Sequence, residues 1–164
     1  MNTETAGNIA VCITAFVAVI TAIIAIYSLK VDHKRRKKQA TFDFYHNIYK
    51  EFRQSLENIE TKFPNDQAIN VESIEDNKHM FDDICGYLSC MERFSVGIDE
   101  DVYDFKVFIR TVGASLTIWW FDKFKEFIPY IRKKYNCPFA YKNLEILVSN
   151  LKIEREKNIK QNIN

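Results

Sequence analysis

One feature of the sequence restricts its possible folds more than any other: the uncharged stretch Ile9–Leu29 near the N-terminus. The only aliphatic hydroxyl groups in this stretch belong to Thr14, Thr21 and Ser28. An α-helix rises about 1.5 Å per residue, so a helix of this length crosses a hydrocarbon core about 30 Å thick. The stretch therefore predicts a transmembrane helix over residues 9–29.

A dense basic cluster, here called the basic collar, follows this stretch immediately. No Lys or Arg precedes the stretch, where a secretory signal would carry its positive charge, so we expect an uncleaved anchor. Because loops rich in Lys and Arg stay in the cytoplasm, we expect a single pass through the inner (cytoplasmic) membrane, N-terminus out and C-terminus cytoplasmic. We expect the collar to contact anionic lipid headgroups, at about 1 kcal/mol per basic residue near the surface. Its members are Lys30, Lys34, Arg35, Arg36, Lys37 and Lys38.

The chain after the collar has the composition of one helical domain. The whole chain contains 13 Phe, 8 Tyr and 2 Trp, but only 4 Gly and 3 Pro, and such scarcity of turn formers argues against an all-β fold. We expect an all-α protein, with one N-terminal transmembrane helix followed by a cytoplasmic bundle of four to five helices. The predicted segments are a short outer tail (1–8), the transmembrane helix (9–29), the collar (30–38), the cytoplasmic helical domain (39–151) and a charged, frayed tail (152–164).

The first helix after the collar carries apolar residues that are alternately three and four positions apart. This spacing forms a continuous apolar seam along one helix face. The seam is compatible with self-association of two chains as a parallel coiled coil, or with packing against other helices of the same domain. We favour the second interpretation, because large aromatic side chains fit poorly at the tight positions of a dimeric coiled coil. The seam consists of Phe42, Tyr45, Tyr49, Phe52, Leu56, Ile59 and Phe63.

Further helices are predicted from apolar spacing and from capping signals. One is expected to begin at Ser73 and to end at Gly97. The next is expected to begin at the acidic run Asp99–Asp101, and Pro129 should kink or split it. The last is expected to begin near Phe139. The side chains expected in the core of these later helices include Trp119, Trp120, Phe121, Leu144, Leu147, Val148 and Leu151. The three aromatic residues could instead form a ligand site, but we favour core packing for them.

The sequence shows no residue pattern typical of catalysis or of metal binding. It has no glycine-rich phosphate loop, no nucleophile elbow and no HExxH zinc motif. Cys85 and Cys90 are five residues apart, which places them on different helix faces and is not a zinc-ligand spacing. Glu92 and Arg93 lie in a strongly apolar helix, where one of them could be a buried polar residue with a role, but we favour an exposed flank for both. We therefore expect no catalytic residue, no metal and no cofactor. A basic collar held at a membrane does not favour nucleic acid as a partner.

Three sequence segments carry a resemblance to a known family. They read KKQATFDF (Lys37–Phe44), YLSCMERFSVGIDEDVYD (Tyr87–Asp104) and FKEFIPYIRKK (Phe124–Lys134). Together with the N-terminal span, they resemble bacterial single-span membrane proteins grouped as domain of unknown function 4760. The resemblance implies a helical cytoplasmic domain attached to one span, and it carries over no catalytic residues.

We weigh three functions for this sequence, of which a hydrolase or transferase is the least favoured because no catalytic pattern is present. The first is a membrane-tethered cytoplasmic helical interaction module, non-enzymatic, that binds anionic lipid headgroups through its collar and an unknown protein partner or itself through its domain. The alternative is a membrane-acting effector of the defence or toxin type that oligomerises, because a single uncharged span lines no polar pathway alone. The sequence favours the interaction module.

Overall fold

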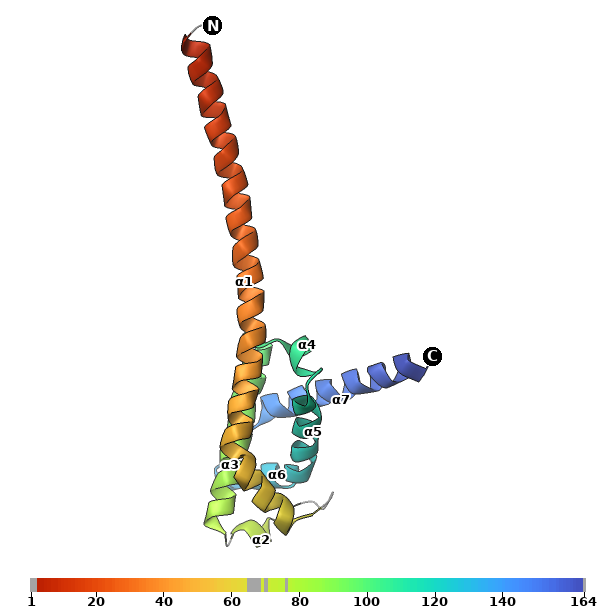
Figure 1. Cartoon of the computed structure of the whole chain (residues 1–164). Coiled ribbons are helices and arrows are strands. Elements are labelled where there is room, and N and C mark those ends of the chain that lie inside the picture. The colour runs from red at the N-terminus through yellow and green to blue at the C-terminus, as the bar shows by residue number, and fades with distance from the viewer. Residues whose placement is uncertain (1–2, 65–68, 70, 76, 164) are drawn as a thin grey trace. The chain divides into compact units, whose positions relative to one another are not determined.

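The computed structural model describes residues 3–64, 69, 71–75 and 77–163, and every regular element among them is an α-helix (Figure 1). The prediction of an all-α protein is therefore confirmed for the described residues. The helices are α1 (Thr3–Lys62), α2 (Glu72–Glu75), α3 (Lys78–Asp99), α4 (Phe105–Phe108), α5 (Val112–Phe124), α6 (Phe127–Lys134) and α7 (Lys142–Ile163).

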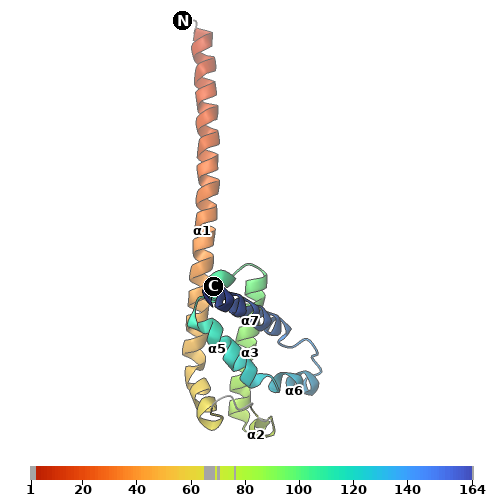
Figure 2. The same ribbon diagram turned by 90° about the vertical axis from the view of Figure 1, so that its right-hand side faces the viewer.

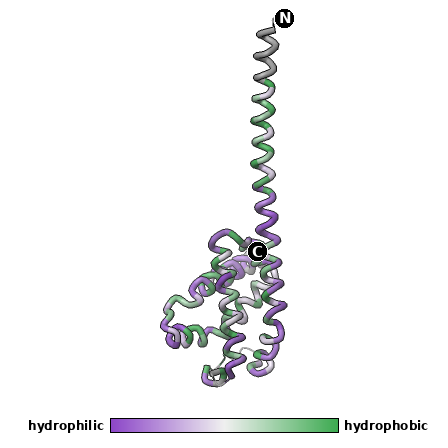
Figure 3. The backbone as a smooth tube through the Cα atoms, turned by 90° about the vertical axis from the view of Figure 1, so that its left-hand side faces the viewer, coloured by the Kyte–Doolittle hydropathy of each residue, from purple (hydrophilic) through white to green (hydrophobic). Residues whose placement is uncertain are grey.

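The chain divides into two compact units, Met1–Lys37 and Lys38–Asn164. The first unit contains the N-terminal part of α1. Where Figure 3 colours this part of α1, it shows a mainly hydrophobic stretch followed by a hydrophilic band. In the sequence this band corresponds to the collar. The second unit contains the remainder of α1 and all later helices, and we call it the helical domain.

Within the helical domain, α1 and α3 lie side by side and run in opposite directions (Figure 2). The ring of Phe44 stacks on that of Phe94 with centroids 5.1 Å apart, and the rings of Phe52 and Tyr87 have centroids 6.0 Å apart. Later residues of α1 thus contact earlier residues of α3, as in an antiparallel pair. The two helices can approach because Gly86 has no side chain. A Cβ there would lie 3.1 Å from the Phe52 ring. Helix α7 packs against both α3 and α5.

The core of the helical domain is rich in aromatic rings, and Phe94 is at the centre of one cluster. Its side chain has no exposed surface. Its ring centroid lies 5.1 Å from that of Phe44, 4.9 Å from that of Tyr103 and 4.7 Å from that of Phe108. These contacts join α1, α3 and the segment around α4, and such aromatic pairs contribute about 0.5–1.5 kcal/mol beyond the burial of their area.

A buried hydroxyl joins the start of the helical domain to the loop before α4. Thr41 lies three residues after Lys38 and is 1% exposed. Its Oγ1 accepts a hydrogen bond of 2.8 Å from the backbone N–H of Asp104. The packing of the helical domain therefore begins directly after the collar, without an intervening loop.

The predicted start and end of the helix that became α3 were both wrong. Ser73 lies within the short α2, and α3 begins at Lys78, where the Asn77 side chain accepts a hydrogen bond of 3.2 Å from the Met80 N–H. Gly97 lies inside α3 rather than after it. Its role is close approach, because a Cβ at Gly97 would lie 2.4 Å from the Tyr103 ring.

The acidic run Asp99–Asp101 does not begin a helix, contrary to the prediction. Asp99 is the last residue of α3, and Asp101 has a left-handed backbone conformation with a φ of 60°. The acid that caps the next helix is Asp104, whose Oδ1 accepts from the Val107 N–H at 3.1 Å. Several neighbouring acids can cap a helix. Here the packing of the adjacent Tyr103 ring on Gly97 and the hydrogen bond from the Asp104 N–H to Thr41 select Asp104.

Pro129 marks a split helix, one of the two expected outcomes. Helix α5 ends at Phe124 and α6 begins at Phe127, so Pro129 is the third residue of α6. The first-turn N–H groups of a helix have no partner within the helix, so proline removes no helical hydrogen bond at this position.

The last helix begins later and extends further than predicted. It begins at Lys142, directly after Tyr141, whose φ of 61° is left-handed, and it continues to Ile163 where a frayed tail was expected. Two ion pairs support this extension, Lys152–Asp122 at 2.6 Å and Lys157–Glu154 at 2.5 Å. The core residues predicted for α7 are all buried: Leu144, Leu147, Val148 and Leu151. Of the three aromatic residues predicted for the core in α5, Trp120 is buried, whereas Trp119 and Phe121 are half-buried.

The favoured position of Glu92 on an exposed flank was wrong, and the alternative, a polar residue with a role, describes it better. Its half-buried carboxylate caps the N-terminus of α7. Oε1 accepts hydrogen bonds from the Asn143 backbone N–H at 3.1 Å and from Asn143 Nδ2 at 2.8 Å. Oε2 accepts one from the Leu144 N–H at 2.7 Å. A carboxylate at this position satisfies free N–H groups and complements the helix dipole. Arg93 is exposed, as expected.

Because Glu92 caps a helix that follows it by 50 residues, replacing it should destabilise the contact of α3 with α7. Glu92→Gln is expected to lower the free energy of unfolding by about 1 kcal/mol and Glu92→Ala by about 2 kcal/mol. Denaturant unfolding followed by circular dichroism measures both values. The exposed Asp82→Asn on the same helix is the control, and an equal loss in this variant would contradict the capping role.

Candidate functional site

The first candidate is the apolar part of α1. Its helix is long and apolar enough to cross a membrane, and no residue of its most apolar window is buried. Phe16 is 67% exposed and Tyr27 is 70% exposed. The large apolar side chains that are exposed between residues 13 and 29 are Ile13, Phe16, Val17, Val19, Ile20, Ile23, Ile24, Ile26, Tyr27 and Leu29. The described part of this helix therefore presents a continuous apolar surface.

The collar residues follow on the same helix. All of α1 from Lys30 to Lys38 is helical, so the basic side chains radiate from one helix segment. Lys37 is half-buried, and the remaining five side chains, Lys30, Lys34, Arg35, Arg36 and Lys38, are exposed. Exposed Lys and Arg side chains on a helix can place their charges at a headgroup layer while their aliphatic stems contact apolar surface.

The structure divides the apolar seam into two parts. Phe52, Leu56, Ile59 and Phe63 are buried in the core of their own helical domain, and Tyr45 is half-buried with its ring close to Gly113. Burial raises the pKa of the Tyr45 hydroxyl to about 12. Phe42 and Tyr49 are 51% and 43% exposed. Any self-association through the seam would therefore have to use Phe42 and Tyr49, and this stays a prediction.

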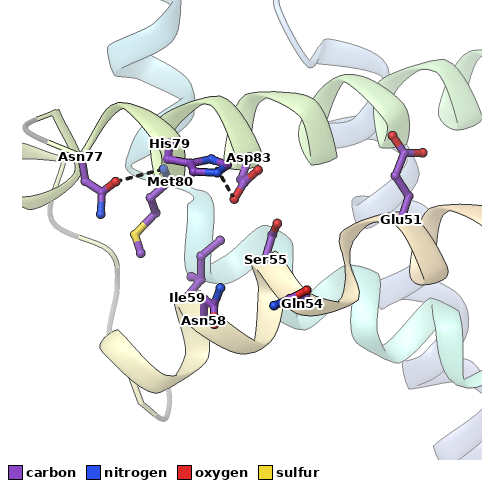
Figure 4. A pocket seen from close by; sticks show the side chains of 9 residues that line it. All are labelled: Glu51, Gln54, Ser55, Asn58, Ile59, Asn77, His79, Met80 and Asp83. Carbon is purple, nitrogen blue, oxygen red and sulfur yellow. Dashed lines mark hydrogen bonds and ion pairs between the residues drawn. The ribbon is translucent and has the colours of Figure 1, made fainter.

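A polar groove lies between α1 and the N-terminal turns of α3 (Figure 4). Its volume is about 550 Å³. Ser55 of α1 points toward the pair formed by His79 and Asp83 of α3. The lining residues are Glu51, Gln54, Ser55, Asn58 and Ile59 from α1, and Asn77, His79, Met80 and Asp83 from α3 and its cap.

The spacing of the α1 residues explains this groove. Glu51, Gln54, Ser55 and Asn58 follow the i, i+3, i+4, i+7 pattern and so share one helix face. This face lies beside the buried stripe, and Ile59 is the point at which the two meet, since it is 1% exposed and also lines the groove. Sequence reasoning missed the groove because it depends on the distance between two helices.

Most polar side chains of the groove are uncommitted. The Asn77 side chain caps α3, and His79 Nδ1 lies 3.8 Å from Asp83 Oδ2. In contrast, four polar side chains from α1 have no hydrogen bond or ion pair among the described residues: Glu51, Gln54, Ser55 and Asn58. Among the residues that the structure describes, no Lys or Arg lines the groove. Its surface can therefore accept hydrogen bonds and balance positive charge.

Buried Lys123 was not predicted from the sequence. It is 4% exposed, and its Nζ donates to Glu60 Oε2 at 2.6 Å and to the backbone carbonyl of Phe63. The same ammonium lies 4.6 Å from the ring centroid of Trp119. The signal available in the sequence was weak: a lysine that follows the apolar run Ile118–Phe121 and the exposed Asp122 in α5. Lys123 satisfies carbonyl oxygen at the C-terminal end of α1 and is therefore a structural residue.

The cysteines and histidines are dispersed in the described structure. Cys85, Cys90 and Cys137 are free thiols. Burial raises the pKa of the Cys85 thiol to about 11, so this thiol is protonated near neutral pH and is a weak nucleophile. Among the described residues, no group of three or more His, Cys, Asp and Glu is arranged to hold a metal ion. His46 and His79 are both exposed.

Comparison with known proteins identifies one family. The family model described as domain of unknown function (DUF4760) matches residues 15–151, which is most of the chain. The chain belongs to this family. The match includes most of the apolar part of α1 and continues through the buried start of α7, so in this DUF4760 protein the apolar helix and the helical domain are parts of one family unit. No curated protein and no solved structure matches the chain.

Proposed function

We propose that this protein is a membrane-tethered interaction module of a bacterial cell. A single span at residues 9–29 holds it in the inner membrane, with the N-terminus outside and the helical domain in the cytoplasm. The collar contacts anionic headgroups, and the helical domain binds a protein partner without catalysing a reaction.

The exposure of the apolar part of α1 carries this proposal. Burying a large apolar side chain is worth about 1.5–3 kcal/mol, and soluble monomers rarely expose contiguous apolar patches larger than a few hundred Å². The ten large exposed side chains between residues 13 and 29 make such a surface unfavourable in water. A lipid bilayer removes this cost, and a helix satisfies its own backbone hydrogen bonds there.

The charge distribution supports the proposed orientation. The exposed collar follows the apolar stretch directly, and the eight residues before that stretch contain Glu4 and no Lys or Arg. Basic residues close to a span determine its orientation more strongly than those far from it. The open groove, with its uncommitted amide and carboxylate groups, supports binding as the role of the helical domain.

A C-terminal reporter that is active only in the cytoplasm should therefore give signal in a bacterial host, and a reporter active only in the periplasm should not. Replacing all six collar residues with Gln should produce mixed topology, because the charge that orients the span is then lost. Replacing Lys152, Arg155 and Lys157 with Gln is the control, and it should leave topology unchanged because these residues lie far from the span. Signal from the periplasmic reporter alone would overturn the orientation.

A further inference from the structure

We propose that the groove between α1 and α3 binds a Lys- or Arg-bearing peptide segment of a partner protein. This inference rests on the proposed function, since it names the surface and the partner chemistry of the interaction module.

Charge complementarity selects a cation as the occupant. The described lining of the groove includes two carboxylates, Glu51 from α1 and Asp83 from α3, and contains no Lys or Arg. Glu51 has no ion-pair partner among the described residues, and Asp83 faces only the His79 ring at 3.8 Å. A guanidinium or ammonium group placed between the two helices would therefore meet acceptors from both sides. Charge-assisted hydrogen bonds of this kind are stronger than neutral ones.

The remaining lining favours a peptide over a free inorganic cation. Gln54 and Asn58 offer side-chain amides that can both donate to and accept from a peptide backbone. Met80 and Ile59 provide an apolar surface on which the aliphatic stem of Lys or Arg can pack. The volume of about 550 Å³ exceeds what one metal ion needs and lies in the range of ligand sites.

The last residue of the collar does not supply this cation. Lys38, the last collar residue, and Glu51 belong to the same helix. They are 13 residues apart (51 minus 38), which corresponds to about 20 Å along the helix axis. Lys38 therefore cannot reach Glu51 while this part of α1 is helical.

The test uses the full chain in nanodiscs of zwitterionic phosphatidylcholine, so that a cationic peptide has no anionic lipid to bind. The probe is a fluorescently labelled arginine-rich peptide, and its counterpart with citrulline in place of arginine is neutral but similar in shape. Fluorescence anisotropy measures both dissociation constants. We expect saturable binding of the arginine peptide and much weaker binding of the citrulline peptide.

The decisive comparison is between two variants that lose equal charge. Glu51→Gln combined with Asp83→Asn should weaken binding about five- to tenfold, as expected for two partly exposed charge contacts. Asp99→Asn combined with Glu156→Gln, both exposed and outside the groove, should change the dissociation constant by less than about twofold. Circular dichroism of each variant verifies folding.

Three results would overturn the inference: no saturable binding, equal binding of the citrulline peptide, or equal weakening in both double variants. Each of them leaves the proposed tether intact if the protein enters the nanodiscs. A chain that fails to enter them would instead contradict the proposed function, so the two failures are distinguishable.

Discussion

Replacing Phe94 with alanine is expected to lower the free energy of unfolding by about 3–5 kcal/mol, the range for removing a fully buried aromatic ring. Phe94 has no exposed surface, and its ring contacts Phe44, Tyr103 and Phe108. The vacated space lies between three segments of the helical domain, which cannot all move inward to fill it. The variant should therefore be among the least stable single substitutions in this protein.

Intrinsic fluorescence of the full chain in detergent can measure this effect. Both tryptophans of the protein, Trp119 and Trp120, lie in α5, so their emission reports unfolding of the helical domain and not of the apolar helix. Val96→Ala, at a 41% exposed position two residues further along α3, is the control and should cost less than about 1 kcal/mol. Similar losses for the Phe94 and Val96 variants would show that the ring cluster is not the core.

Lys123→Met should cost about 2–4 kcal/mol, because it removes the donor that satisfies both the Phe63 carbonyl and the Glu60 carboxylate. Methionine has similar length, so packing is largely retained and the lost polar contacts dominate. Glu60→Gln should cost less, about 0.5–1 kcal/mol, since Lys123 keeps the carbonyl and the Glu60 side chain is 37% exposed.

Denaturant unfolding followed by tryptophan fluorescence again gives the free energies. Lys125→Met is the matched control, because Lys125 is exposed and only two residues away. The double variant of Lys123 and Glu60 should be more stable than the sum of the single losses predicts, as for residues that share one network. If Lys123→Met is no worse than Lys125→Met, the ammonium does not stabilise the end of α1.

The periodic apolar pattern predicted helix type and core faces well. Leu144, Leu147, Val148 and Leu151 are all buried as expected, because a 3.6-residue period leaves one face for the core wherever the helix begins. The same period could not distinguish Trp119 from Trp120. Adjacent residues point in different directions, and only the position of Phe124 and Tyr87 around Trp120 decides which ring is covered.

Helix ends and the candidate site were predicted less well, for a common physical reason. Asp99 and Asp104 have the same side chain and equal capping ability, and the choice between them depends on Thr41, which is more than 50 residues distant. Glu92 and Lys123 likewise have partners 51–52 and 60–63 residues away in the chain. Local sequence carries no information about such partners, so neither the inter-helix cap nor the groove could be inferred from it.

The hydrogen bond from Asp104 to Thr41 also limits how far the helical domain can range. With residues 9–29 in the bilayer as proposed, only 12 residues separate Leu29 from Thr41 (41 minus 29), where tertiary packing begins. Even fully extended, 12 residues reach about 40 Å. On this proposal the domain is confined to a thin layer beside the membrane. A partner that also resides at the membrane would meet it there at a far higher effective concentration than a freely diffusing one. Partners of this protein should accordingly be sought among other membrane-associated proteins.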